Sequence, residues 1–298
     1  MTSRAARPHR HRTQSGRRGT IEMPVAELPS ARIRYELRGR GGDPTVLIHG
    51  SWVDHHTWDL VVPGLAPSLD VVAYDRRGHG ESTGVPPQHA VADDAADLAA
   101  LLEAIDQFPA HLVAHSYGGA VALRLAADRP EMVRSLALHE PPFVGLLTED
   151  PTTAPEGEYL LAQVRRLQAR ARSGDREGAV REAMDAFTLE PGAWLRVPPT
   201  VRAGFVRQAD RWVEEMDDPE ALRPDPQRVA DVMVPVLVTY GTQSPGFLRR
   251  IAEQLGADFH IGAVLPLHDA GHVPHLSQPA QYVGMLLTFL VERNVPVT

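Results

Sequence analysis

This chain of 298 residues contains neither cysteine nor lysine. Without cysteine it cannot form disulfides, use a thiolate as a nucleophile or bind a metal through cysteine sulfur. Without lysine it cannot form a Schiff base between a side-chain amine and a carbonyl compound. These absences exclude several kinds of covalent and metal chemistry, and they leave arginine as the only strong cation.

Long apolar runs and an excess of positive charge are missing as well. No stretch approaches the roughly 18 continuous apolar residues that a membrane-spanning helix needs. The formal net charge is -8, which disfavours binding to nucleic acid or to an anionic membrane, because both attract concentrated positive charge. We therefore expect a soluble protein with a small-molecule substrate. No metal or nucleotide motif is present, so we expect no cofactor, and homo-oligomer formation is left open.

The first 23 residues differ in composition from the rest of the chain. They carry six arginines and two histidines before the first acidic residue, Glu22. They lack the apolar run that follows the basic region of a secretory signal, which favours a cytoplasmic protein. One interpretation is a basic arm that touches an acidic partner. We prefer a disordered basic tail over residues 1–23, or an upstream extension with a natural start at Met23.

Beyond this tail, short apolar segments alternate with amphipathic ones. The first, "ARIRYELRG", alternates apolar and polar residues as a half-buried strand does. The later ones are continuous apolar runs bounded by turn residues. The six predicted strands cover residues 31–39, 45–50, 70–75, 110–116, 133–140 and 234–241. Continuous apolar strands interleaved with helices indicate a mostly parallel sheet that is covered on both faces.

Helical spacing of apolar residues predicts helices at 90–105, 117–130 and 278–292. The region 143–231 is different, because it lacks strand signals and has helix-like stretches at 156–173, 176–189 and 197–216. We interpret it as a helical cap inserted into an α/β core made of residues 24–142 and 232–298. The predicted fold class is therefore α/β, with a central sheet, flanking helices and an inserted cap.

The strongest local motif is "LVAHSYGGAVAL". Ser116 follows an apolar strand directly, and small residues, Ala114 and Gly118, lie two positions before and after it. Such spacing is typical of a nucleophile elbow, in which a strained turn between strand and helix tolerates only small neighbours. The backbone amide of Tyr117 would then point toward the oxyanion of a tetrahedral intermediate.

With this motif, the chain from about residue 30 to 293 resembles an α/β-hydrolase, although Ala114 stands where glycine is most usual. The resemblance implies that the turn "IHGSW" supplies the second oxyanion amide, from Ser51 or Trp52. We choose Ser51 and expect Trp52 to contact substrate. For His49 we expect a structural role, in which its ring braces the turn.

The loop "YDRRGHGES" also resembles a loop of that family. Its charged residues invite a catalytic interpretation. We expect a structural role instead, with glycines making the turns and Asp75, Arg76 and Glu81 satisfying one another and the backbone.

The predicted general base is His272, in "LHDAGHVPHL", because it precedes the last helix, where the family places its base. His268 and His275 are the competing histidines. Any of them would need a carboxylate on its other ring nitrogen.

The position of that carboxylate is the open question. The stretch "YGTQSPGF" offers no acid, because Ser244 and its neighbours are uncharged. Glu140 ends the preceding predicted strand, at the edge of the sheet where catalytic groups gather in such folds. Some family members, certain haloalkane dehalogenases among them, carry their acid after this strand. We therefore predict the triad Ser116–Glu140–His272, with Asp269 as the reserve acid.

The predicted reaction is hydrolysis of an ester or related acyl bond in a small, largely apolar substrate. Aromatic residues of the cap suggest an apolar pocket: Phe187, Trp194, Phe205 and Trp212. Lactone, thioester, peptide and carbon–carbon bond hydrolysis stay open, as does cofactor-free perhydrolase or haloperoxidase-like chemistry. The alternative from another class is a binding protein that keeps the fold but not the activity.

Overall fold

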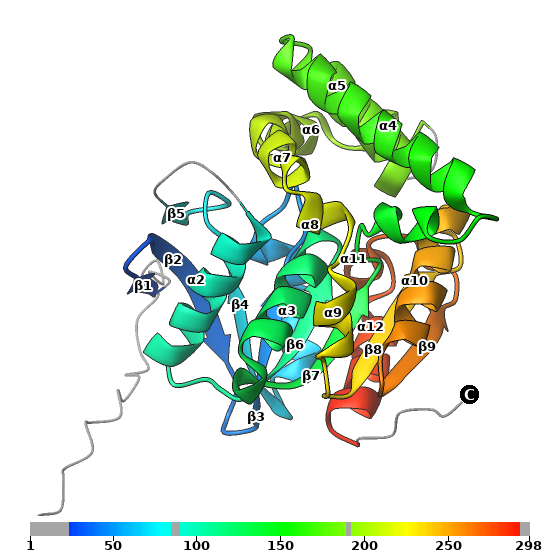
Figure 1. Ribbon diagram of the computed structural model, residues 1–298. Coiled ribbons are helices and arrows are strands. Elements are labelled where there is room, and N and C mark those ends of the chain that lie inside the picture. The colour runs from blue at the N-terminus through cyan, green and yellow to red at the C-terminus, as the bar shows by residue number, and fades with distance from the viewer. Residues whose placement is uncertain (1–23, 85–89, 189–191, 293–298) are drawn as a thin grey trace, which may run out of the picture.

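The computed structural model describes residues 24–84, 90–188 and 192–292. The predicted basic tail, 1–23, lies outside these ranges. Within them, nine strands form one sheet in the order β1-β2-β4-β3-β6-β7-β8-β9, with β5 paired to β2 (Figure 1). The strands are β1 Val25–Glu27, β2 Ala31–Arg38, β3 Asp43–Ile48, β4 Leu69–Tyr74, β5 Thr83–Gly84, β6 Ala110–His115, β7 Val133–His139, β8 Val236–Gly241 and β9 Gly262–Leu267.

Pairing between strands is parallel from β4 through β9 and antiparallel where β2 meets β1, β4 and β5. Parallel strands need crossover connections, and helices provide them here. The helices of the core are α1 Val62–Leu65, α2 Val91–Ala104, α3 Tyr117–Asp128, α10 Gly246–Asp258, α11 Pro274–Ser277 and α12 Pro279–Leu290. The mostly parallel sheet flanked by helices agrees with the predicted fold class.

Successive residues of the central strands point to opposite faces of the sheet, and each face has its own hydrophobic cluster. On β3, Val46 and Ile48 belong to the cluster that includes residues of α2, α3 and α10, whereas Leu47 belongs to the cluster that includes residues of α1 and α12. This arrangement explains why the central strands are continuous apolar runs, since neither face meets water. The strands therefore form a rigid platform whose carboxyl ends carry the site.

An inserted helical region follows β7 and precedes β8, and most of it lies above the carboxyl ends of the strands (Figure 1). It begins with a short 3-10 helix, η3 Val144–Thr148, that packs against α10. Its α-helices are α4 Ala154–Arg172, α5 Arg176–Ala183, α6 Pro199–Arg207, α7 Ala209–Asp217, α8 Pro219–Leu222 and α9 Pro226–Ala230. The last two return along α3 of the core.

The six predicted strands and the predicted helices are all present. Three strands were not predicted, namely β1, β5 and β9. Two of them are very short, and β9 is an edge strand that contains Pro266 and has three partly exposed or exposed residues in a row. Because proline is unusual in strand interiors, this segment resembles a loop in the sequence. Among the described residues, no helix is long and apolar enough to cross a membrane.

Candidate active site

Ser116 stands at a sharp turn between β6 and α3, with backbone angles φ 52° and ψ -125°. Positive φ is costly for a residue with a Cβ atom, and such strain often marks a functional position. Steric crowding explains the small neighbour two positions later. A Cβ atom on Gly118 would lie 2.5 Å from the carbonyl oxygen of Ile48. The turn therefore presents the Ser116 hydroxyl at the carboxyl end of the sheet.

His272 and Glu140 form a close buried pair beside this serine. Nδ1 of His272 lies 2.7 Å from Oε2 of Glu140, so the Nδ1–H group donates a hydrogen bond to the carboxylate and Nε2 is the ring nitrogen left to take a proton. Glu140 also accepts a 2.7 Å hydrogen bond from the backbone amide of Gly241, at the end of β8. The carboxylate is thus held by two neighbouring segments.

Electrostatics keep Glu140 ionised although its side chain is fully buried. Burial alone would raise the pKa of this carboxyl. The rings of His139 and His272 nearby, together with the hydrogen bond from His272, outweigh burial and lower its pKa to about 2. A charged carboxylate next to a histidine ring fixes the ring's tautomer and stabilises the protonated ring when it takes a proton.

The competing residues occupy other places. Asp269 is exposed, has φ 55° and accepts no hydrogen bond from His272 within the described structure. His268 is exposed and lines a second, separate hollow between β9 and α12. His275 is buried and its Nε2 contacts the hydroxyl of Thr57 at 2.8 Å. Of these acids and histidines, only Glu140 and His272 lie at the cavity with Ser116.

Three further buried histidine rings surround His272. His115, which precedes Ser116, donates from Nε2 to the carbonyl oxygen of His272 at 2.7 Å and so holds the backbone of His272. Burial lowers the pKa of His115 well below its ordinary value, and it lowers those of His139 to about 4 and His275 to about 3. These rings are therefore neutral at pH 7 and act as packing and hydrogen-bonding groups.

The turn after β3 is braced as predicted. Nε2 of His49 accepts a 3.0 Å hydrogen bond from the backbone amide of Arg76, and Nδ1 donates to the carbonyl oxygen of Gly50 at 2.8 Å. Gly50 lies so close to Ser116 that a Cβ atom on Gly50 would be 3.0 Å from Cβ of Ser116. Ser51 follows it at the cavity wall. We call residues 49–52 the oxyanion loop, after the oxyanion amide that the sequence predicts at Ser51.

The expected pairing within "YDRRGHGES" is wrong for Arg76. Its guanidinium reaches outside the motif, to Asp94 on α2 at 2.8 Å and to Glu215 on α7 at 2.5 Å. Asp75 instead pairs with His55 and binds the backbone amide of Glu81. Glu215 was not among the predicted site residues, because 139 positions separate it from Arg76 and no local motif marks it.

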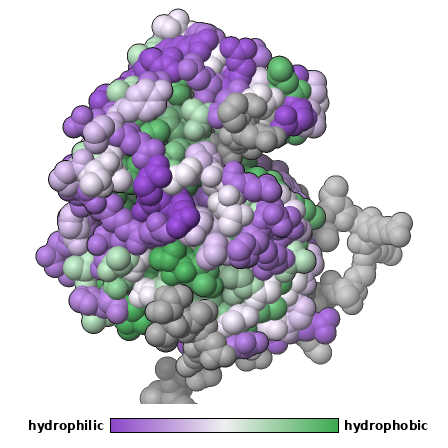
Figure 2. All heavy atoms as spheres, turned by 90° about the vertical axis from the view of Figure 1, so that its right-hand side faces the viewer, coloured by the Kyte–Doolittle hydropathy of each residue, from purple (hydrophilic) through white to green (hydrophobic). Residues whose placement is uncertain are grey.

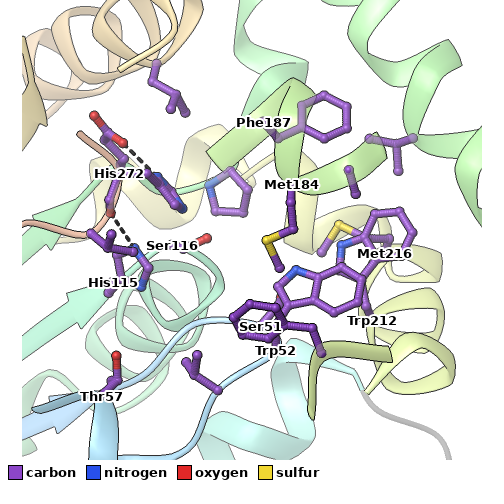
Figure 3. Close-up of a pocket in the computed structure, with 18 of the residues that line it drawn as sticks. Ser51, Trp52, Thr57, His115, Ser116, Met184, Phe187, Trp212, Met216 and His272 are labelled. Atoms are coloured by element: carbon purple, nitrogen blue, oxygen red, sulfur yellow. Dashed lines mark hydrogen bonds and ion pairs between the residues drawn. The ribbon is translucent and has the colours of Figure 1, made fainter. Parts of the chain in front are cut away.

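A cavity of about 280 Å³ lies between the core and the inserted helices. In Figure 3, Ser116, His115 and His272 lie on one wall, opposite Trp52, Trp212, Met184, Met216 and Phe187. Trp52 stacks on Trp212 with ring centroids 5.1 Å apart. Phe205 also lines the cavity, whereas Trp194 is buried away from it.

The lining is almost entirely apolar. Its polar members are Ser51, Thr57, His115, Ser116, Glu140 and His272, and no arginine is among the described lining residues. In the space-filling view, hydrophilic side chains dominate the outer face of the insert, and hydrophobic ones are visible in the hollow beneath it (Figure 2). The site therefore favours an uncharged, apolar ligand.

One group of residues could hold a metal ion by geometry. Asp54, His55 and Asp75 can bring three ligand atoms within 4.8 Å of one another. Both carboxylate oxygens of Asp75 already accept hydrogen bonds, from the amide and ring of His55 and from the amide of Glu81. The group is accounted for by these bonds alone.

Comparison with known proteins agrees with this fold. The model of the alpha/beta hydrolase family matches residues 45–285. Over 114 residues the chain is 41% identical to the dihydrolipoyllysine-residue acetyltransferase component of an acetoin cleaving system from Pseudomonas putida. These residues make up 38% of this chain and 31% of that protein. The matches span 31% to 48% of the lengths of the first curated relatives.

Two longer matches cover most of both chains. A pimeloyl-[acyl-carrier protein] methyl ester esterase from Neisseria meningitidis is 29% identical over 249 residues, 82% of this chain and 91% of that protein. The crystal structure of an alpha/beta hydrolase from Sphaerobacter thermophilus superposes with a TM-score of 0.71 at 26% identity, covering 90% of this chain and all of that one.

Proposed function

Because the chain belongs to the alpha/beta hydrolase family, we propose that it hydrolyses esters of small, neutral, apolar compounds through a serine acyl-enzyme. The observation that carries this proposal is the pairing of His272 with the buried, ionised Glu140 at the cavity that also holds Ser116. The methyl ester esterase from Neisseria supports an ester as the substrate class.

In the first half of the proposed reaction, Oγ of Ser116 attacks the ester carbonyl carbon and its proton passes to Nε2 of His272. The carbonyl electron pair moves onto oxygen, and the backbone amides of Tyr117 and Ser51 stabilise that oxyanion. Glu140 stabilises the protonated imidazole. The tetrahedral intermediate then collapses, the proton moves from His272 to the leaving alkoxide, and the alcohol departs.

Water completes the cycle by the same route. His272 takes a proton from the water as it attacks the acyl carbon, and returns that proton to Ser116 when the acid is released. We assign residues 143–231 as a cap that covers this chemistry. Its apolar side chains, Trp212 among them, would bind the acyl or alcohol chain, together with Trp52 of the core.

The apolar lining makes a quantitative prediction about substrates. Burying one methylene group contributes about 0.8 kcal/mol, which corresponds to roughly a fourfold gain in affinity. In a series of nitrophenyl esters, kcat/KM is expected to rise about fourfold per added acyl carbon until the cavity is full. Esters that carry a free carboxylate are expected to be poor substrates, because no arginine is among the described residues that line the cavity.

Lactones and thioesters of matched size belong in the same assay, since they share the acyl carbon. Ser116→Ala should abolish turnover of every substrate, and Ser173→Ala, at an exposed serine of the insert, should change nothing. Hydrolysis that persists in Ser116→Ala, or a preference for charged esters, would contradict the proposal.

A further inference from the structure

One carboxylate of the insert reaches down to the oxyanion loop. Glu215 lies on α7 and is fully buried. Its Oε2 accepts a 2.5 Å hydrogen bond from the hydroxyl of Ser51, and its Oε1 accepts a 2.5 Å hydrogen bond from Nη2 of Arg76. The same helix also carries Trp212, which stacks on Trp52 of the loop.

Arg76 extends this contact along the loop backbone. Its Nε donates to the carbonyl oxygen of His49 and its Nη2 to that of Gly50, both at 3.1 Å. The guanidinium carbon also lies 4.5 Å from the centre of the Tyr117 ring. One side chain therefore contacts both segments whose amides are assigned to the oxyanion.

The insert supplies one of the two carboxylates that balance the charge of Arg76, namely Glu215. Burial disfavours the charged guanidinium, but Glu215 and Asp94 raise the pKa of Arg76 above its ordinary value. A buried ion pair is weak evidence for added stability, because desolvation offsets much of the attraction. The hydrogen bonds of this pair do, however, fix the positions of the groups that they join.

We propose that Glu215 and Arg76 are positioning residues that hold the oxyanion loop in its catalytic geometry. The inference rests on the proposed function, because it assumes an oxyanion that the Ser51 and Tyr117 amides stabilise. The proton of the Ser51 hydroxyl is committed to Glu215, so the backbone amide is the donor left for substrate. Catalysis then requires α7 of the insert to be seated on the core.

Kinetics of Glu215→Gln test this role, because the substitution keeps the shape of the side chain and removes its charge. Small displacements of catalytic groups cost up to about 100-fold in rate, so kcat is expected to fall about 10- to 100-fold with KM changed less than about threefold. A trifluoromethyl ketone, which forms a tetrahedral oxyanion with the serine, should lose affinity by the same factor as kcat/KM.

Glu156→Gln is the matched control. Glu156 on α4 pairs with Arg250 on α10, at 2.5 Å, and so also joins the insert to the core, but through α10 and not through the loop. It should leave kcat and ketone affinity unchanged. An equal loss in both variants would show general loosening of the insert and overturn the proposal.

Two other results would also overturn the proposal, namely wild-type kcat in Glu215→Gln, or a lower kcat with unchanged ketone affinity.

If Glu215→Gln does not fold, the double variant Arg76→Met/Glu215→Met tests the proposal instead, because removing both charges together avoids an unpaired buried ion. Asp94 can then become neutral, since burial raises its pKa to about 6 even beside Arg76. The double variant should fold and show the same loss; full activity would contradict the proposal. A wild-type protein that hydrolyses no ester would count against the proposed function instead.

Discussion

Two histidine–carboxylate pairs in this molecule are nearly identical in local geometry. Nδ1 of His272 is 2.7 Å from Glu140, and Nδ1 of His55 is 2.6 Å from Asp75. Both carboxylates are fully buried, and both histidines are only 5% exposed. Nevertheless, only one pair lies at the cavity with the strained serine.

The other nitrogen of each ring explains the difference. Nε2 of His55 is buried and makes no hydrogen bond within the described part of the chain, so substrate cannot reach it. Asp75 also accepts hydrogen bonds from the backbone amides of His55 and Glu81, and these bonds join the loop after β4 to the segment after β3. A close histidine–carboxylate pair is therefore not sufficient for catalysis, and its place relative to a nucleophile and a cavity decides its role.

The largest expected effect separates the two pairs by activity. Glu140→Gln should lower kcat by about 1,000- to 10,000-fold, because the amide no longer stabilises the protonated His272 or fixes its tautomer. Steady-state kinetics on the best nitrophenyl ester measure this, with circular dichroism to check that the variant is folded. A loss of less than tenfold in a folded variant would show that Glu140 is not the acid.

The matching change in the second pair should act on stability. Asp75→Asn removes the charge beside His55 and weakens the bonds to two amides, so the free energy of unfolding should fall by about 3 kcal/mol. Urea denaturation measures it. In the fraction that stays folded, kcat should remain within about threefold of wild type. A 100-fold loss of kcat without a loss of stability would reverse the assignment of the two pairs.

The pH dependence of this stability difference should be bell-shaped. Burial opposes protonation of His55, but the hydrogen bond to Asp75 raises its pKa above 6.5. The stabilisation that protonated His55 provides is therefore complete below pH 6.5, and it is lost as pH rises through the pKa of His55 in the folded state. Burial opposes ionisation of Asp75, but hydrogen bonds from His55 lower its pKa below 3.8. The stabilisation that ionised Asp75 provides is therefore present above pH 3.8, and it is lost as pH falls through the pKa of Asp75 in the folded state. When the free energy of unfolding is measured from pH 3 to 9, wild type and Asp75→Asn should differ most between pH 3.8 and 6.5. A constant difference would contradict an ion pair.

The smallest expected effect concerns the reserve acid. Asp269→Asn should leave kcat within about twofold of wild type, because the side chain is exposed. For the same reason the free energy of unfolding should stay within about 0.5 kcal/mol of wild type. The same assays apply. A large loss here, with activity kept in Glu140→Gln, would exchange the roles of the two acids.

Much of the core could be predicted because its determinants are local. Ser116 has its strand, its small neighbours and its helix within a dozen residues, and Glu140 was predicted as the acid because it ends the next predicted strand. The edge strand β9 was missed because Pro266 and partial exposure hide the pattern of a buried strand.

Contacts between the insert and the core could not be predicted in this way. Glu215 meets Ser51 and Arg76 only after the chain has folded over the sheet, and 164 and 139 positions separate these pairs. In the sequence, Glu215 is one acidic residue on an amphipathic helix, which ordinarily indicates a solvated face. Only its burial in the structure distinguishes it.

The assignment of Ser116, Glu140 and His272 as a catalytic triad is tested most directly by the masses of the intact protein and of its peptides after reaction with a fluorophosphonate. We expect one adduct per chain, on Ser116, formed at a rate that falls strongly in Glu140→Gln and is unchanged in Asp75→Asn. An unmodified folded protein, or an adduct on another residue, would contradict this assignment.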